Sequence, residues 1–126
     1  SMKNKSILVV DDEESILLSL EHQLSQQGFD VDTAESGEEA IKKLDANSSY
    51  DLVITDLRMY GETGVDVMIK AQETNANTSV LIITGFGSES PLFKDAMALK
   101  PCGHAFKPFS KEELLKKVRT CLEDTN

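Results

Sequence analysis

The stretch ILVVDDEE, residues 7–14, runs four apolar residues directly into four consecutive acids. A continuous apolar run is typical of a strand that is buried on both faces of a parallel sheet. Carboxylates held close together at the end of such a strand repel one another, because each raises the cost of ionising its neighbour. The stretch therefore predicts a buried strand and, at its carboxyl end, a source of positive charge that offsets the repulsion.

The rest of the chain continues this alternation of strand-like and helix-like segments. Residues 6–10, 52–55 and 79–84 are continuous apolar runs. Residues 29–34 alternate between apolar and polar positions, as an edge strand does, and residues 104–106 form a shorter candidate. Apolar residues recur at helical spacing after each segment: Ile16, Leu20 and Leu24; Ile41 and Leu44; Val65, Met68 and Ile69; Phe93, Ala96 and Met97; and Leu114, Val118 and Leu122.

Five strand–helix units predict the fold class. Right-handed crossovers between successive strands give a parallel sheet that is covered by helices on both faces. We therefore expect a doubly wound α/β domain of the (βα)5 type, a flavodoxin-like three-layer sandwich with its five-stranded parallel sheet in the order 2-1-3-4-5. Gly28 and Pro91 agree, because glycine suits a helix C-terminus and proline a first helical turn. We expect one domain over residues 5–123, with tails at 1–4 and 124–126.

The charge of the chain excludes several partners. With 22 acidic and 13 basic residues among 126, the formal net charge is −9, which repels nucleic-acid phosphates and anionic lipid. We therefore expect no direct nucleic-acid or membrane binding. No apolar run approaches the roughly 20 residues that span a bilayer, and the N-terminus SMKNKS lacks the apolar core of a signal peptide, which favours a cytoplasmic location. Ser1 before Met2 is typical of a scar left by tag removal.

Two cysteines, Cys102 and Cys121, lie far apart in the sequence without a CxxC spacing. Such a pair does not indicate a metal site or a catalytic thiol. We therefore expect two reduced thiols that behave as small hydrophobic side chains.

Polar residues follow the predicted strands at their carboxyl ends, which is the edge where open α/β sheets bind ligands. These residues are Asp11 and Asp12 after the first strand, Asp56 after the third, Thr84 after the fourth and Lys107 after the fifth. If the first and third strands are neighbours, three carboxylates converge in one crevice. Hard oxygen ligands of this kind suit Mg²⁺, with Mn²⁺ as the alternative ion.

Most of these residues also have a plainer interpretation. Asp12 can cap a helix, Thr84 can be an ordinary β-former, and Lys107 can be a solvated surface charge. Asp56 differs, because it lies inside an otherwise apolar segment where burial without a partner is costly. The bond from Lys107 to Pro108 is a candidate cis peptide that would aim the ammonium into the crevice. The joint placement of these residues favours a functional site.

These motifs resemble those of the receiver domain of two-component response regulators. The resemblance covers residues 5–123 and rests on DD after the first strand, D-x-R-M with a following G-x-x-G after the third, ITG after the fourth and KPF after the fifth. The phrases TDLRM, LIITGFG and FKPF are most similar to receivers of bacterial enhancer-binding regulators. The resemblance implies a CheY-like signalling protein that is not an enzyme, since it catalyses only its own phosphorylation and dephosphorylation.

The resemblance also implies a role for each site residue. Asp56 is the implied phosphoacceptor, and Asp11 and Asp12 are the implied acidic pair that holds Mg²⁺ directly or through water. The backbone carbonyl of Arg58 would complete the protein's share of the metal shell.

The implied donor is a phosphohistidine on a sensor histidine kinase or phosphotransfer protein, with small acyl phosphates as substitutes. Thr84 would donate a hydrogen bond to one phosphoryl oxygen, Lys107 would pair with another, and Gly85 would leave space for the group to enter. The residue types fit independently, because phosphoryl transfer requires an in-line nucleophile and positive charge on the phosphoryl oxygens.

Several positions depart from or extend the family's usual pattern. Tyr60 stands where receivers usually have proline, which leaves the loop after the third strand more mobile. His104, three residues before Lys107, stands where receivers carry Tyr or Phe; we hypothesise that it is the switch residue and makes coupling weaker or pH-dependent, the alternative being a surface histidine without this role. Arg58 and Phe86 each lie two positions beyond a site residue, where bulky side chains could slow dephosphorylation or simply pack the loops.

The resemblance places the output on a face built from residues 91–99, 104–106 and 111–122. Added phosphoryl charge beside Asp56 would move Thr84 and its loop. The face would then bind a downstream effector domain or protein, or a second copy of the chain, provided that this partner prefers the phosphorylated state.

Three other classes of protein are alternatives to this interpretation. A haloacid-dehalogenase-like phosphatase needs a second acid two residues after its nucleophile, where this chain has Arg58. A flavodoxin-like cofactor binder needs a hydroxyl-rich phosphate loop after the first strand, where this chain has DDEE. The main alternative is a receiver-like protein-interaction module that no longer signals by phosphorylation, which Tyr60 and His104 suggest.

Overall fold

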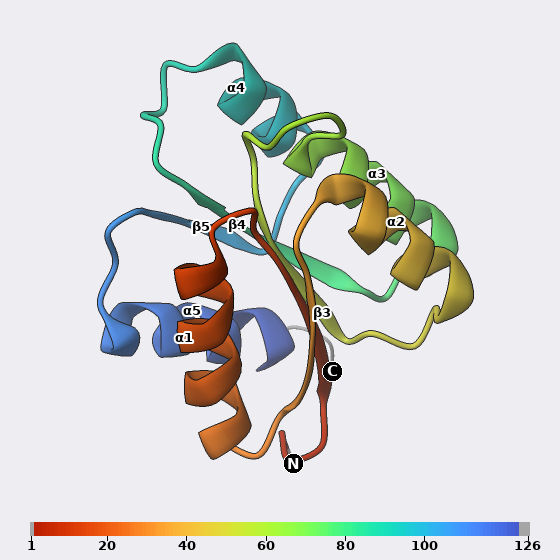
Figure 1. Ribbon diagram of the computed structural model, residues 1–126, viewed down its shortest axis with the longest axis vertical. Helices are drawn as coiled ribbons and strands as arrows, with labels where there is room; N and C mark the ends of the chain where they lie inside the picture. The colour runs from red at the N-terminus through yellow and green to blue at the C-terminus, as the bar shows by residue number, and fades with distance from the viewer. Residues whose placement is uncertain (1, 124–126) are drawn as a thin grey trace.

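The computed structural model describes residues 2–123, whose strands and helices alternate along the chain (Figure 1). The expected tag scar at Ser1 and the expected tail at 124–126 lie outside the described residues. No helix of residues 2–123 is long and apolar enough to cross a bilayer. The strands are β1 (Ser6–Val10), β2 (Asp30–Ala34), β3 (Leu52–Asp56), β4 (Ser79–Thr84) and β5 (Gly103–Phe106); the helices are α1 (Glu14–Gln26), α2 (Gly37–Ala46), α3 (Gly64–Thr74), α4 (Pro91–Ala98) and α5 (Lys111–Glu123).

The strands form one parallel sheet in the order β2-β1-β3-β4-β5, which confirms the predicted topology. Val10 of β1 pairs with Thr55 of β3, so the residues that come next, Asp11 and Asp56, lie side by side at the carboxyl edge. Asp56 pairs in turn with Ile83 of β4. The register therefore brings polar residues from separate parts of the chain to one edge of the sheet.

Two apolar cores lie on opposite faces of the sheet. Successive residues of a strand point to opposite faces, so Ile7 and Val9 of β1 pack in one core while Leu8 and Val10 pack in the other. Helices α1 and α5 cover the first face, and α2, α3 and α4 cover the second (Figure 1). These four β1 side chains are fully buried, which explains why they form a continuous apolar run.

Helix α3 buries a different stripe of side chains from the predicted one. The spacing favours Val65, Met68 and Ile69, but Ile69 is 41% exposed. The residues that α3 buries include Val67, Met68 and Ala71. Apolar residues surround this helix on most sides, so their spacing does not fix which side faces the sheet.

The helix ends follow the predicted signals and add one that the pattern did not reveal. Gly28, which follows α1, has φ +92°, a conformation that favours glycine, and Pro91 is the first residue of α4. At the start of α3, Asp66 N donates a hydrogen bond to Thr63 Oγ1, and Thr63 N donates one to Asp66 Oδ2 at 2.9 Å. This reciprocal capping box fixes where α3 begins after the loop that follows Asp56.

The prediction of two reduced thiols is wrong, because Cys102 and Cys121 form a disulfide bond. Their Cα atoms lie 5.2 Å apart although 19 positions separate the two residues. This proximity arises because α5 packs on the sheet beside β5. The spacing of the cysteines in the sequence carries no sign of that packing.

Candidate functional site

Three carboxylates gather at the carboxyl edge of the sheet. Asp11 and Asp12 directly follow β1, and Asp56 is the last residue of β3. One carboxylate oxygen from each of them lies within 4.8 Å of the others. Asp11 is fully buried and Asp56 is 6% exposed, whereas Asp12 faces solvent. The strand order therefore builds a crevice with two buried acids and one exposed acid.

Lys107 brings positive charge to this crevice. Its Nζ lies 2.7 Å from Asp11 Oδ2, 3.3 Å from Asp56 Oδ2 and 3.4 Å from Glu13 Oε1. The lysine side chain is 14% exposed, and the peptide bond to Pro108 is cis. Glu13 was not predicted as a site residue, although it is the third acid of the DDEE run and that run was the available signal.

One oxygen of the crevice has an unusual environment. Asp11 Oδ2 is completely buried and accepts no hydrogen bond of favourable geometry, so the nearby Lys107 ammonium attracts it only electrostatically. A buried carboxylate oxygen without a donor is costly. Oxygen ligands about 2.1 Å from Mg²⁺ lie at most about 4.2 Å apart, so small shifts, or a water at the exposed Asp12, would bring the three acids into such a shell. The residues present therefore fit a divalent cation.

Burial controls the protonation of the crevice. Burial raises the pKa of Asp56 to about 6, with a further contribution from the charge of Asp11 and an opposing one from Lys107. Burial also raises the pKa of Asp11, against the lowering influence of the nearby Lys107 ammonium and of a hydrogen bond from the Glu13 N–H. Burial lowers the pKa of Lys107, but the two aspartates together outweigh it and leave that pKa raised. An added cation would therefore favour ionisation of both acids.

The loop after β3 orients the Asp56 carboxylate. Asp56 Oδ1 accepts a hydrogen bond from Leu57 N at 2.8 Å, which leaves Oδ2 beside Lys107. Gly64 N donates to Leu57 O at 2.8 Å. Gly64 lies so close to the Asp56 carbonyl that a Cβ there would overlap it. The second glycine of the G-x-x-G pattern therefore lets the loop close around Asp56.

The loop after β4 contacts the loop after β3. Thr84 is 1% exposed, and its Oγ1 accepts a hydrogen bond from Phe86 N at 3.1 Å. A side chain at Gly85 would meet open space. The Arg58 guanidinium lies over the Phe86 ring, with Cζ 4.5 Å from the ring centre. The sequence singled out Arg58 and Phe86 individually, but it did not predict the contact between them.

Two predicted residues lie away from the carboxylates. His104 is on the side of β5 that faces α4, where its ring is edge-on to Phe93 at 5.2 Å and to Phe106 at 5.3 Å between ring centres. Phe93 and Phe106 are stacked at 5.5 Å. His104 is half-buried within this aromatic cluster. Tyr60, in the loop between β3 and α3, is 96% exposed.

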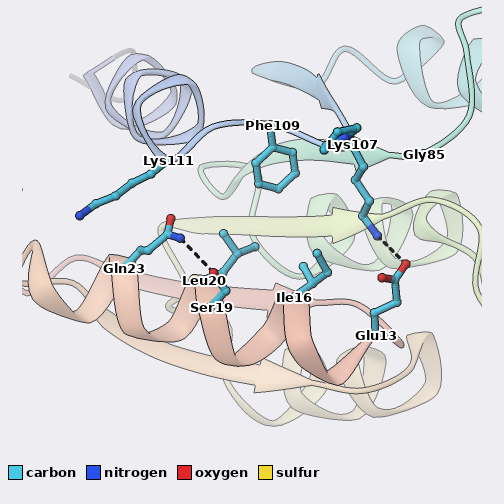
Figure 2. A pocket seen from close by; sticks show the side chains of 10 residues that line it. Glu13, Ile16, Ser19, Leu20, Gln23, Gly85, Lys107, Phe109 and Lys111 are labelled. Carbon is cyan, nitrogen blue, oxygen red and sulfur yellow. Dashed lines mark hydrogen bonds and ion pairs between the residues drawn. The ribbon is translucent and has the colours of Figure 1, made fainter.

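A groove of ≈ 450 Å³ opens beside the crevice, between α1 and the segment that joins β5 to α5 (Figure 2). The ion pair between Lys107 and Glu13 lies at one end of it, next to the carboxylates. The groove thus gives a bulky partner a recessed surface adjoining the Asp56 site. Its lining residues are Glu13, Ile16, Ser19, Leu20, Gln23, Gly85, Lys107, Pro108, Phe109 and Lys111.

Comparison with known sequences points to one family. The sequence profile described as response regulator receiver domain matches residues 7–119. The alkaline phosphatase synthesis transcriptional regulatory protein PhoP of Bacillus subtilis is 35% identical over 121 residues, covering 94% of this chain and 49% of that protein. The transcriptional regulatory protein ResD of the same organism is 38% identical over 117 residues, covering 92% of this chain and 47% of that protein. The chain spans about half the length of these relatives.

Comparison with solved structures agrees. A response regulator receiver domain protein from Clostridium thermocellum has a TM-score of 0.82 at 30% identity, covering 94% of both chains. The chemotaxis protein CheY4 of Vibrio cholerae has a TM-score of 0.83 at 32% identity, covering 94% of this chain and 99% of that one. Because the profile extends from β1 into α5 and these structures match across the whole sheet, the chain belongs to the family of response regulator receiver domains.

Proposed function

We propose that Asp56 accepts a phosphoryl group from a phosphohistidine, on a sensor histidine kinase or phosphotransfer protein, in the cytoplasm. The observation that carries this proposal is the placement of Lys107 Nζ, within 3.3 Å of the Asp56 carboxylate and 2.7 Å of the buried Asp11 carboxylate. A carboxylate, a lysine ammonium and an acidic cluster that could hold a metal ion thus share one crevice, and phosphoryl transfer requires an in-line nucleophile and positive charge on the phosphoryl oxygens.

The transfer itself needs little from the protein beyond position and charge. A carboxylate oxygen of Asp56 forms a bond to phosphorus while the phosphorus–nitrogen bond of the donor breaks and the imidazole leaves with the electron pair. Lys107, which pairs with Asp56 beforehand, would turn to the phosphoryl oxygens as they arrive. The hydroxyl of Thr84 would donate a hydrogen bond to one of them, and the open space at Gly85 would admit the group.

The metal site would be formed by the carboxylates of Asp11, Asp12 and Asp56 together with the Arg58 carbonyl. Bound Mg²⁺, or Mn²⁺ in its place, would supply positive charge that neutralises phosphoryl oxygens. The buried Asp11 Oδ2, which accepts no hydrogen bond, is the feature of this chain that most favours such an ion. The domain would act on its own acyl phosphate only and would not turn over an external substrate.

The donor would approach through the groove beside Lys107 (Figure 2). Its apolar wall, which includes Ile16, Leu20 and Phe109, suits a helical partner that presents a phosphohistidine at its surface. Lys107, which lines the groove, contacts Asp56 Oδ2, so a partner seated there would bring its reactive ring near Asp56.

Phosphorylation would change the surface formed by α4, β5 and α5, which would serve as the output face. Movement of Thr84 toward the phosphoryl group would release its hydrogen bond from Phe86 N and shift the loop that leads into α4. His104 contacts α4 through Phe93, so its ring would respond to that shift as the switch residue. An effector domain, an effector protein or a second copy of the chain would bind the altered face.

The test is incubation with acetyl phosphate and Mg²⁺, followed by intact mass measurement. One labile phosphoryl adduct on the parent, absent in Asp56→Asn and present in the control Asp45→Asn, supports the proposal. Repeated release of phosphate without an adduct would indicate a phosphatase. No adduct from either acetyl phosphate or a phosphorylated histidine kinase would instead favour an interaction module that no longer signals by phosphorylation.

A further inference from the structure

The disulfide between Cys102 and Cys121 lies on the α5 side of the sheet, outside the carboxylate crevice. Cys102 directly precedes β5, and Cys121 lies near the end of α5. The bridge therefore closes a loop that contains β5, Lys107 and most of α5. The phosphoryl chemistry proposed for Asp56 makes no use of this bond.

The two cysteines differ in accessibility. Cys121 is 0% exposed within the apolar core. Cys102 is partly exposed and lines a pocket of ≈ 420 Å³, which is within the size range of small-molecule sites, about 300–1,000 Å³. Within residues 2–123, the side of Cys102 is therefore the one from which a small reagent can approach the bridge. The other residues that line this pocket are Gly103, Glu113, Lys116, Lys117 and Thr120.

The charges around the pocket favour an anionic ligand. Lys116 and Lys117 contribute two positive charges, against one negative charge from Glu113. Positive charge that lines a recess raises the local concentration of anions. Low-molecular-weight thiols of the glutathione class are anions at neutral pH, and their reactive form is the thiolate. Their charge and their nucleophile both suit this pocket.

The surroundings of the two cysteines can accommodate both the disulfide and the two thiols. Cys102 Sγ lies 3.2 Å from the Val80 carbonyl oxygen; a disulfide sulfur has no hydrogen to donate, but a Cys102 thiol would donate its S–H to that oxygen. Cys102 N also donates to Val80 O at 2.8 Å, so this segment is held to β4 whether or not the bridge is closed. A reduced Cys121 would remain in the core as a small apolar side chain.

We propose that Cys102 is a thiol–disulfide exchange site for anionic low-molecular-weight thiols, which Lys116 and Lys117 attract. The thiolate attacks the Cys102 sulfur, the bond between the two cysteines breaks, and Cys121 leaves with the electron pair and takes up a proton. A second small thiolate then attacks the mixed disulfide, releasing Cys102 and a small-molecule disulfide. Two electrons pass from two small thiols to the protein, and the reverse steps, with the small disulfide as oxidant, close the bridge.

The site is tested with single-cysteine variants of the folded chain. Cys121→Ala and Cys102→Ala are each incubated with oxidised glutathione, and the mixed disulfide is located by peptide mass spectrometry. We expect modification of Cys102 in the first variant and none of Cys121 in the second. Modification of Cys121 as fast as Cys102, with the circular dichroism of both variants native-like, would overturn the proposal.

The role of the lysines is tested on the parent chain, without removing either cysteine. We expect Lys116→Gln combined with Lys117→Gln to slow reduction by glutathione about three- to tenfold at low salt, because electrostatic attraction is lost. Reduction by 2-mercaptoethanol, whose reactive thiolate carries one negative charge fewer than that of glutathione, should slow less, and the control Lys42→Gln, on α2 across the sheet, should behave as the parent. Equal rates with glutathione in the double variant and the parent would contradict the proposed attraction.

Discussion

The Cζ atom of Arg58 lies 4.5 Å from the centre of the Phe86 ring, so the loop after β3 and the loop after β4 touch two residues beyond Asp56 and Thr84. Phe86 is 48% exposed, so the contact lies at the surface of the protein. A guanidinium over an exposed aromatic ring is worth about 0.5–1 kcal/mol. We predict that the pair acts as a modest cover that slows the approach of water to the proposed phosphorylation site.

Removing this cover should shorten the life of the phosphorylated state. We expect Arg58→Ala and Phe86→Ala each to speed phosphate loss about two- to fivefold, which corresponds to the energy of one such contact. The double variant should lose little more than either single variant, because one contact is broken in all three. Decay of the adduct by intact mass gives the rates, and Tyr60→Ala, exposed in the same loop, is the control. Unchanged lifetimes in both single variants would rule out the cover.

The stability of the metal-free protein should depend on the ionisation of Asp56. The pKa of Asp56 is about 6 when folded, against an ordinary value of 3.8, so the folded state holds this proton more tightly than the unfolded chain does. Stability from this group is therefore present at low pH, is lost as pH rises from 3.8 to about 6, and stays lost above that. We expect Asp56→Asn to raise the free energy of unfolding at neutral pH by about 1–3 kcal/mol.

The measurement is denaturant unfolding of Asp56→Asn and the parent across this pH window. The difference between the two should be small at the acid end, should grow through the window and should shrink when Mg²⁺ is added, because the ion favours the ionised parent. Asp45→Asn, at an exposed ion pair with Lys70, serves as the control. A difference that stays constant with pH would contradict the shifted pKa of Asp56.

His104 should sense phosphorylation through its aromatic neighbours. Its ring is edge-on to Phe93 of α4 and to Phe106, and ring currents make imidazole resonances sensitive to small displacements. We expect a stable phosphoryl mimic at Asp56 to shift the His104 resonances, because movement of the loop that leads into α4 would displace Phe93 relative to the imidazole ring. His22, exposed on α1, is the other histidine of the chain and an internal reference. His104 shifts no larger than those of His22 would remove it as the switch.

Space at Gly85 should matter for phosphorylation and not for folding. A Cβ added at Gly85 meets no atom within 4 Å, and the same is true of Gly87, so alanine at either position should leave the unfolding midpoint unchanged. Gly85 lies beside Thr84, where the phosphoryl group would enter, so we expect Gly85→Ala to slow adduct formation several-fold and Gly87→Ala to leave it unaffected. Equal rates of adduct formation would show that this space is not used.

Much of this architecture could be predicted from the chain, because strands of a parallel sheet are buried on both faces and so appear as continuous apolar runs. The end of each run then identified Asp11, Asp56, Thr84 and Lys107, and the strand order required them to converge. The buried stripe of α3 could not be predicted in this way. Its apolar residues surround the helix, and only its packing against the sheet selects Val67 over Ile69.

Contacts between distant side chains also escaped prediction. The disulfide depends on α5 lying beside β5, and no spacing motif accompanies Cys102 and Cys121. The contact between Arg58 and Phe86 depends on the paths of two loops. Neither loop sequence carries a motif that predicts where the other loop lies. Glu13 was missed for a different reason, since only the position of Lys107 distinguishes it from an ordinary acid at a helix start.

The side chains of the short strand β5 alternate between the two faces of the sheet. Ala105 packs with the core beneath α1 and α5, and a side chain at Gly103 would meet Cys121 there, whereas His104 and Phe106 present rings to Phe93 of α4. The proposed thiol exchange near α5 and the proposed ring movement near α4 would therefore affect alternate positions of one strand. Phosphorylation of Asp56 and thiol exchange at Cys102 would thus both affect β5. Substitutions at single positions of this strand could separate the two effects.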